Sequence, residues 1–192
     1  MSIVERAVQV LRRDGLIVYP TDTVYGLGGD ALSEDAVLKV YESKQRPVSN
    51  PISVAVSDIE MLAAIAVVHS REQAFIERFL PGPVTVVLEA KSCLPPVLMG
   101  GTEMIGIRMP AHELALQIIA AFDAPITATS ANISGEPDPV SPNDVHVVSD
   151  LVIDGGKLPG TPSTVVDLVD WEIIRAGAAC EEVAAYLVEA GR

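Results

Sequence analysis

Apolar and polar positions alternate along the chain with two different periods. Apolar spacings of three or four residues predict helices over 2–13, 34–43, 112–122 and 181–190. Polar residues three apart mark helix starts, at Ser2 with Glu5, Ser57 with Glu60 and Ser70 with Gln73. Short apolar runs rich in Val and Ile predict strands over 16–19, 52–56, 84–89, 104–109, 126–129, 151–154, 163–168 and 172–175.

The order of these elements indicates the fold class. Helices and strands intermix, as in proteins that contain parallel strands. The segment 168–171 is too short for a parallel crossover and predicts a hairpin turn instead. We therefore expect an α/β (α+β) fold, with one twisted mixed parallel and antiparallel sheet flanked by helices.

The stretch 15–30 joins a buried strand to a polar, glycine-rich turn. Pro20 ends the apolar run because proline cannot donate to a ladder. Thr21, Asp22 and Thr23 follow, and glycines then allow the backbone to turn sharply. Such a strand end predicts a small-molecule site. The alternative is an ordinary turn in which these side chains make local hydrogen bonds.

Composition narrows the protein class. At 192 residues and 49% hydrophobic content, we expect one domain over 1–192 with a substantial core. No apolar run approaches the roughly 18 residues of a membrane span. Cys93 and Cys180 lie far apart without metal-ligand spacing, which is typical of a reduced cytoplasm. We therefore expect a cytoplasmic protein without membrane contact.

The net charge of −13 argues against a protein that grips nucleic acid over its whole surface. A local anion site remains compatible with this charge, because salt screens charges beyond about 8 Å. Lys44 and Arg46 are two residues apart and predict a clamp for a polyphosphate. Their alternative is a solvated helix end, where the helix dipole favours basic residues.

Further cations and small polar groups lie at predicted strand ends. Arg108 ends one strand on the face that also carries Gly106, and Arg175 ends another. Ser130 and Asn132 follow a third strand, and Ser163 opens a fourth. Each has an ordinary structural alternative, as a rim arginine or a turn residue. Their recurrence favours one concave site for an anionic ligand.

No metal or triad motif accompanies this site. The histidines do not form an HxxxH or His–Cys cluster, and the chain has no GxSxG element. The sequence therefore gives no support to metal-dependent hydrolysis or Ser–His–Asp chemistry, and no metal-ligating residues are predicted.

Seven motifs occur in the order found in one known family. They are YPTDTVYGLG (19–28), SKQRP (43–47), NP (50–51), PGPVTVVL (81–88), IRMPAH (107–112), SANISG (130–135) and STVVDL (163–168). The chain thereby resembles the YrdC-like family of threonylcarbamoyl-AMP synthases over nearly its whole length. The resemblance implies a twisted mixed sheet with a concave cationic cavity, in the short, single-domain form of the family.

The resemblance also implies a reaction. L-Threonine, bicarbonate and ATP would give threonylcarbamoyl-AMP and pyrophosphate, with Mg²⁺ on the ATP phosphates. A downstream tRNA threonylcarbamoyl transferase would then use the product. Two alternatives stay open: an RNA-binding module, and a nucleotide-binding paralogue with another carbamoyl or amino-acid substrate.

Family roles carry over to matching residues. The resemblance implies a catalytic, phosphate-holding tetrad of Lys44, Arg46, Ser130 and Asn132, and further ATP contacts from Asn50 and Arg175. It implies a threonine site made of Thr23, Arg108 and Ser163. The chain departs from the family at Ala55, where many relatives have histidine, and at Met104 and Asp138, where Thr and Ser are frequent.

Overall fold

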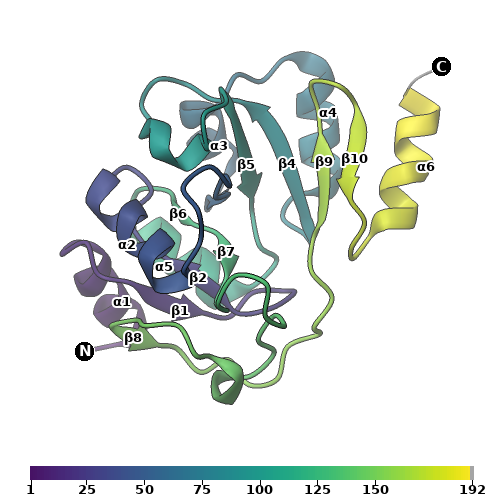
Figure 1. Ribbon diagram of the computed structural model, residues 1–192. Coiled ribbons are helices and arrows are strands. Elements are labelled where there is room, and N and C mark those ends of the chain that lie inside the picture. Colours follow the sequence, from purple (N-terminus) through teal and green to yellow (C-terminus); the bar gives the residue numbers. More distant parts are fainter. Residues whose placement is uncertain (191–192) are drawn as a thin grey trace.

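The computed structural model describes residues 1–190 and is drawn in Figure 1. The α-helices are α1 (Ile3–Leu11), α2 (Glu34–Lys44), α3 (Ile59–Ile65), α4 (Ser70–Phe79), α5 (Glu113–Phe122) and α6 (Cys180–Ala190). The strands are β1 (Ile17–Tyr19), β2 (Gly26–Gly28), β3 (Val54–Ala55), β4 (Val84–Glu89), β5 (Met104–Arg108), β6 (Ile126–Thr127), β7 (Thr129–Ser130), β8 (Leu151–Val152), β9 (Thr164–Asp167) and β10 (Glu172–Arg175).

The strands form two mixed sheets. A four-stranded sheet has the order β7-β2-β1-β8, and a six-stranded sheet has the order β10-β9-β4-β5-β3-β6. Each sheet contains both parallel and antiparallel pairs. The predicted α/β class with mixed strand pairing is confirmed, and β9 and β10 form the expected hairpin. The prediction of one continuous sheet is wrong, because there are two.

The segment 126–130 explains this difference. Ile126 pairs with Ala55 in the six-stranded sheet, whereas Thr129 pairs with Leu27 in the four-stranded sheet. Ala128 lies between them and donates its N–H to Ser53 O at 2.7 Å. An alternating apolar and polar pattern predicts an extended chain but does not identify its partners, so this segment was predicted as one strand.

Helices cover the outer faces of both sheets. Helices α3, α4 and α6 pack on the six-stranded sheet through a core that includes Leu62, Phe75 and Val183. Helices α1 and α5 pack together beneath the four-stranded sheet, with Leu11 and Ile119 fully buried. In Figure 1, α6 lies beyond β10 and α1 lies beside β1. The inner faces of the two sheets are thereby left to form the walls of a cavity.

The helix starts follow capping chemistry, with two changes of residue. Ser2 and Glu5 form the predicted reciprocal cap of α1. For α3, Asp58 replaces Ser57 as the cap, and its Oδ1 accepts the N–H of Met61 at 2.8 Å. For α4, Glu72 rather than Gln73 reaches back to the cap residue. Carboxylates succeed here because a charged acceptor binds backbone N–H groups more strongly than a neutral one.

Several predicted elements are shorter than their patterns. The strand expected over 52–56 is reduced to Val54–Ala55, and the segment after Ser141 forms a 3-10 turn, Pro142–Asp144. A second 3-10 turn, Pro96–Met99, lies between β4 and β5. Among the described residues, no helix combines the length and the apolar character needed to cross a membrane. Cys93 and Cys180 are both free thiols.

Candidate active site

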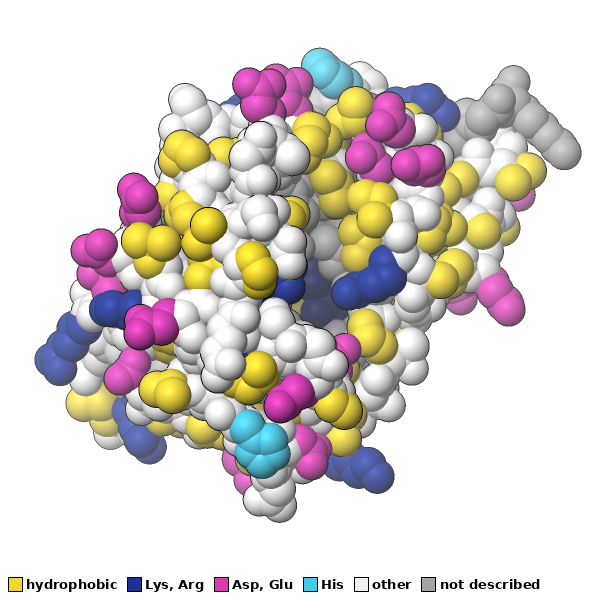
Figure 2. Space-filling view, viewed as in Figure 1, with side chains coloured by type: hydrophobic (Ala, Val, Ile, Leu, Met, Phe, Trp, Pro, Cys, Tyr) yellow, Lys and Arg dark blue, Asp and Glu magenta, His cyan; other side chains and the backbone are white. Residues whose placement is uncertain are grey.

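A cavity of about 180 Å³ lies between the inner faces of the two sheets. The lining includes Arg46, Arg108 and Arg175 but a single carboxylate, Asp138. Figure 2 shows basic side chains at the hollow in the middle of this face, while acidic side chains are spread over the surrounding surface. The overall negative charge of the chain therefore does not extend into the cavity, where positive side chains outnumber negative ones.

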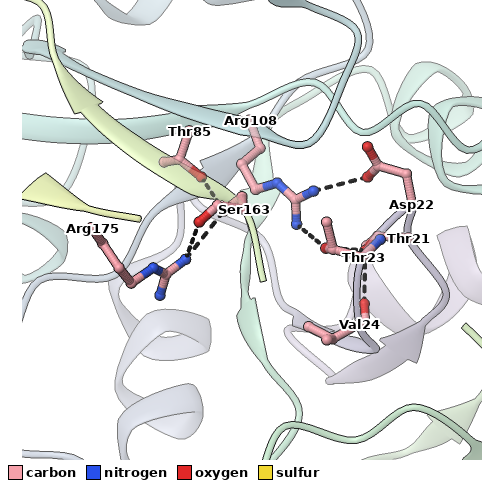
Figure 3. Close-up of polar contacts among 8 residues, drawn as sticks. All are labelled: Thr21, Asp22, Thr23, Val24, Thr85, Arg108, Ser163 and Arg175. Carbon is pink, nitrogen blue, oxygen red and sulfur yellow. Dashed lines mark hydrogen bonds and ion pairs between the residues drawn. The ribbon is translucent and has the colours of Figure 1, made fainter. Parts of the chain in front are cut away.

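Arg108 is the most buried of these arginines. It ends β5, and its Nη1 donates to Thr23 Oγ1 at 3.1 Å while its Nη2 donates to Asp22 Oδ1 at 2.8 Å (Figure 3). Burial lowers the pKa of Arg108, and the neighbouring Asp22 carboxylate opposes this shift. The guanidinium is thus fixed in orientation and remains charged, as a partner for a carboxylate must be.

The polar turn after β1 holds these partners of Arg108. Thr21 Oγ1 donates to Val24 O at 2.7 Å and accepts the N–H of Thr23 at 3.1 Å. Arg108 Nε and Asp22 Oδ2 are buried without a hydrogen-bond partner among the described residues. The alternative of purely local turn hydrogen bonds is therefore only partly correct, because the turn also binds a cation from the other sheet.

On the opposite wall of the cavity, Arg175, Ser163 and Thr85 form a second hydrogen-bonded series of side chains. Arg175 Nη2 donates to Ser163 O at 2.9 Å and to Ser163 Oγ at 3.2 Å. Ser163 Oγ lies 2.8 Å from Thr85 Oγ1 (Figure 3). Thr85 was not identified from the sequence as a site residue. Its inward-facing position in an otherwise apolar strand, VTVVLE, was the available signal.

A β-bulge directs Arg175 into the cavity. Ile173 pairs with Val166, but Arg175 pairs with Val165, so Ile174 is an extra residue between the two pairs. Val165 lines the cavity. Without the bulge, strand alternation would turn Ile174 toward the cavity and Arg175 away from it. Instead Ile174 is 57% exposed.

The absence of a side chain at Gly106 leaves space for Ser53 and Thr85 in the cavity wall. A Cβ on this residue would collide with Ser53 Oγ and lie 3.3 Å from Thr85 Cγ2. Something was expected to pack against this bare glycine, and the structure identifies Ser53 as the closest group. Ser53 and Thr85 both line the cavity.

Lys44 does not line the cavity but binds the 130–132 turn, which includes a lining residue. Its Nζ donates to Ser130 O, to Asn132 O at 2.8 Å and to Asn132 Oδ1 at 3.0 Å, and its side chain is only 2% exposed. An ammonium group has three N–H donors, so these contacts account for all of them. Burial lowers the pKa of Lys44 to about 8; Arg46 adds to this effect and Asp138 opposes it. In this arrangement Lys44 braces the 130–132 turn.

The same turn is held by its own side chains. Ser130 Oγ donates to Asn132 Oδ1 at 2.7 Å, and Asn132 Nδ2 donates to Glu136 O at 2.6 Å. Ser130 lines the cavity, whereas Lys44 and Asn132 are not among its lining residues. The predicted tetrad is therefore brought together, but its members differ in their access to a ligand.

Arg46 reaches the cavity from the end of α2. Its Nε donates to Asn50 O at 3.1 Å, and its Nη2 donates to Pro51 O at 2.9 Å. These contacts fix the guanidinium against the 50–51 segment. The side chain of Asn50 is exposed and does not line the cavity.

The three positions that depart from the family pattern are separated in space. Asp138 lines the cavity, whereas Ala55 is buried in the apolar core that it shares with α1 and α5, and Met104 lies at the opposite end of β5 from Arg108. The described residues contain no group of three or more His, Cys, Asp or Glu side chains arranged to hold a metal ion.

Most of this chain matches a known protein family. The model Sua5_yciO_yrdC, described as telomere recombination, matches residues 9–177. The chain belongs to the Sua5/YciO/YrdC family. This agrees with the seven ordered motifs, each of which contributes at least one residue to the cavity lining.

Relatives within the Sua5/YciO/YrdC family differ in length. A threonylcarbamoyl-AMP synthase of Pyrococcus abyssi is 42% identical over 86% of this chain and 50% of its own length. A threonylcarbamoyl-AMP synthase of Klebsiella pneumoniae is 33% identical over 91% of this chain and 95% of its own. The crystal structure of P. abyssi Sua5 complexed with L-threonine superposes with a TM-score of 0.89 at 38% identity, covering 94% of this chain and 56% of that one. The chain thus spans about half the length of several curated relatives it matches.

Proposed function

We propose that this chain forms threonylcarbamoyl-AMP and pyrophosphate from L-threonine, bicarbonate or CO2, and ATP. The observation that carries the proposal is the convergence of Arg108, Thr23 and Ser163 on one cavity. The relatives support it, because curated members of the family are named threonylcarbamoyl-AMP synthases and one similar structure is a complex with L-threonine.

The proposed amino-acid site lies around Arg108. Its guanidinium would bind the threonine carboxylate through N–H groups that Asp22 and Thr23 leave open. Ser163, across the cavity, would contact the rest of the amino acid. Because these groups are already fixed by hydrogen bonds, little ordering would be needed on binding.

The proposed ATP site lies toward Arg46, Ser130 and Arg175. The two arginines would bind phosphate oxygens with their planar N–H groups, and Ser130 would donate its hydroxyl. Asn50 belongs to the same proposed site and holds Arg46 through its backbone oxygen. Lys44 and Asn132 would act on ATP mainly through the 130–132 turn that they hold.

The proposed chemistry places few demands on proton transfer within the protein. The threonine amine attacks CO2 and loses one proton, which gives a carbamate. A carbamate oxygen then attacks the α-phosphorus of ATP, the new P–O bond forms, and the bond to pyrophosphate breaks. Positioning and charge stabilisation would therefore supply most of the rate enhancement.

Magnesium fits this site as a companion of ATP. Mg²⁺ is usually bound by substrate phosphates, waters and one or two carboxylates. Asp138 is the carboxylate that lines the cavity, and it would be the residue that helps to hold such an ion. The ion would neutralise phosphate charge there, while the arginines orient the phosphates.

The product would pass to a tRNA threonylcarbamoyl transferase, which moves the threonylcarbamoyl group to tRNA. Direct tRNA binding by this chain is expected to be weak, because its net charge is −13. A single YrdC-like domain over 1–192 and a cytoplasmic location remain predictions of the sequence.

Pyrophosphate release from ATP tests the proposal. The assay contains bicarbonate and Mg²⁺, and it compares threonine, serine and no amino acid. Threonine-dependent release is expected. Release with serine alone would identify a paralogue with another substrate, and salt-dependent tRNA binding without any release would identify an RNA-binding module.

A further inference from the structure

Thr85 occupies a place in the cavity wall that the proposed residue roles do not explain. Its side chain is 3% exposed, yet it lines the cavity between Arg108 and Ser163. Its hydroxyl lies 2.8 Å from Ser163 Oγ, and no other hydrogen bond is described for it (Figure 3). Since one contact uses only part of the hydrogen-bonding capacity of a hydroxyl, this group can also bind a ligand in the cavity.

Proton bookkeeping defines what the Thr85–Ser163 pair can offer. Each hydroxyl has one proton and two acceptor positions. Arg175 donates to Ser163 Oγ, so the spare proton of the pair cannot be directed to Arg175. One proton is used between the two hydroxyls, and one remains. The pair is therefore a single O–H donor facing the cavity.

The direction of the hydrogen bonds from Arg175 through Ser163 to Thr85 leaves that donor on Thr85. If Ser163 accepts from Arg175 and donates to Thr85, all the hydrogen bonds run in one direction and strengthen one another. Thr85 then keeps the free proton. Thr85 also pairs directly with Arg108 across β4 and β5, where opposed side chains are about 4.5–5.5 Å apart at Cβ.

This spacing suits two groups of one small amino acid. A carboxylate bound at Arg108 and a β-hydroxyl on the same molecule are separated by only a few bonds. A neutral O–H donor matches a neutral hydroxyl oxygen, while the cationic Arg108 matches the carboxylate.

The geometry points to Thr85 as a specificity-determining residue that donates its hydroxyl to the side-chain oxygen of a β-hydroxy amino acid. This inference rests on the proposed function and deepens it. When L-valine binds instead of L-threonine, the ligand has no hydroxyl oxygen, and the Thr85 O–H is left buried without an acceptor. The site therefore selects against valine, the apolar isostere of threonine.

The test compares Thr85→Val with Thr85→Ser. The KM of L-threonine is measured by pyrophosphate release, and the inhibition constant of L-valine is measured as a competitor of threonine. Thr85→Val should raise the threonine KM about tenfold and lower the inhibition constant of valine, because valine no longer leaves a buried donor unpaired, so selectivity should fall at least about tenfold. Thr85→Ser keeps the hydroxyl and should restore selectivity.

Thr127→Val is the matched control. Thr127 is also buried on a strand, but its hydroxyl binds Leu27 O and the N–H of Gly29 and does not line the cavity. It should lower thermal stability without changing selectivity.

Parallel changes for threonine and valine in Thr85→Val, or no change in either, would overturn the inference while leaving the proposed function in place. Absence of threonine-dependent release in the unaltered protein would overturn the proposed function and this inference with it.

Discussion

Asp22 Oδ1 lies 2.8 Å from Arg108 Nη2, with both side chains about one-tenth exposed. Asp22 follows β1 of the four-stranded sheet, whereas Arg108 ends β5 of the six-stranded sheet. The pair therefore links the two sheets across the cavity. It compensates a buried cation while leaving further N–H groups of Arg108 unused by these contacts.

Asp22→Ala should lower the free energy of unfolding by about 3–5 kcal/mol, because it leaves the buried charge of Arg108 without its partner. Urea denaturation measures this loss. Asp150→Ala is the control, since the exposed Asp150 carboxylate only accepts the N–H of Leu16, and about 1 kcal/mol is expected there. Equal losses in the two variants would contradict the importance of the ion pair.

Arg46→Ala should weaken ATP binding by about 1.5–3 kcal/mol, the scale of hydrogen bonds to charged groups. The KM of ATP in pyrophosphate release should rise accordingly, while the KM of threonine changes little. Arg12→Ala removes an exposed arginine away from the cavity and serves as the control. Undiminished turnover of ATP by Arg46→Ala would remove Arg46 from the phosphate site.

Lys44 should make stability depend on pH in the alkaline range. Its pKa is lowered to about 8, below its ordinary value of 10.5, so between these values the unfolded chain binds more protons than the native one. The contribution of Lys44 to the free energy of unfolding should therefore be constant below pH 8 and rise above it, by at most about 1.4 kcal/mol per pH unit.

Urea denaturation of the unaltered chain and of Lys44→Met, at several pH values between 7 and 10, measures this effect. Other titrating groups are common to both proteins, so the difference between the two curves isolates Lys44. The stability advantage of the unaltered chain should grow with pH. A difference that shrinks with pH would mean that burial does not lower this pKa.

Gly106→Ala should lower stability by about 1–3 kcal/mol, because the added methyl group collides with the Ser53 hydroxyl. Thermal unfolding measures the loss of stability. The KM of threonine reports whether displacement of Ser53 disturbs the cavity wall. Combining it with Ser53→Ala removes the nearest atom and should recover part of the stability. No loss in the single variant would show that Ser53 moves freely.

Much of the fold follows from local signals in the sequence. Val84 to Glu89 was predicted as a strand because β-branched residues bounded by Pro83 leave few alternatives. The division into two sheets was not predictable in this way, since Ile126 and Thr129 belong to one extended segment whose partners are distant in sequence.

Some residues of the candidate site could be predicted from the sequence, and others could not. Arg108 was found because it ends an apolar strand beside a glycine, and Thr23 because it follows a strand end. Lys44 was predicted to hold phosphate, yet its donors are directed to the 130–132 turn, which lies far away in sequence. Thr85 was missed because one threonine in a strand is common, and its partner Ser163 comes from a distant strand.

The bulge in β10 makes one wall of the cavity depend on strand register rather than on the identity of the bulged residue. Ile174 is exposed and has no pairing partner within the ladder, so many side chains should be tolerated there. Its loss would leave Arg175 directly after Ile173 and still opposite Val165, whereas pairing Ile174 itself with Val165 would put an isoleucine in the cavity in place of the arginine. Within this hairpin, a slip of one residue in the register is therefore equivalent to a reversal of polarity at the site, although no residue of the site is replaced.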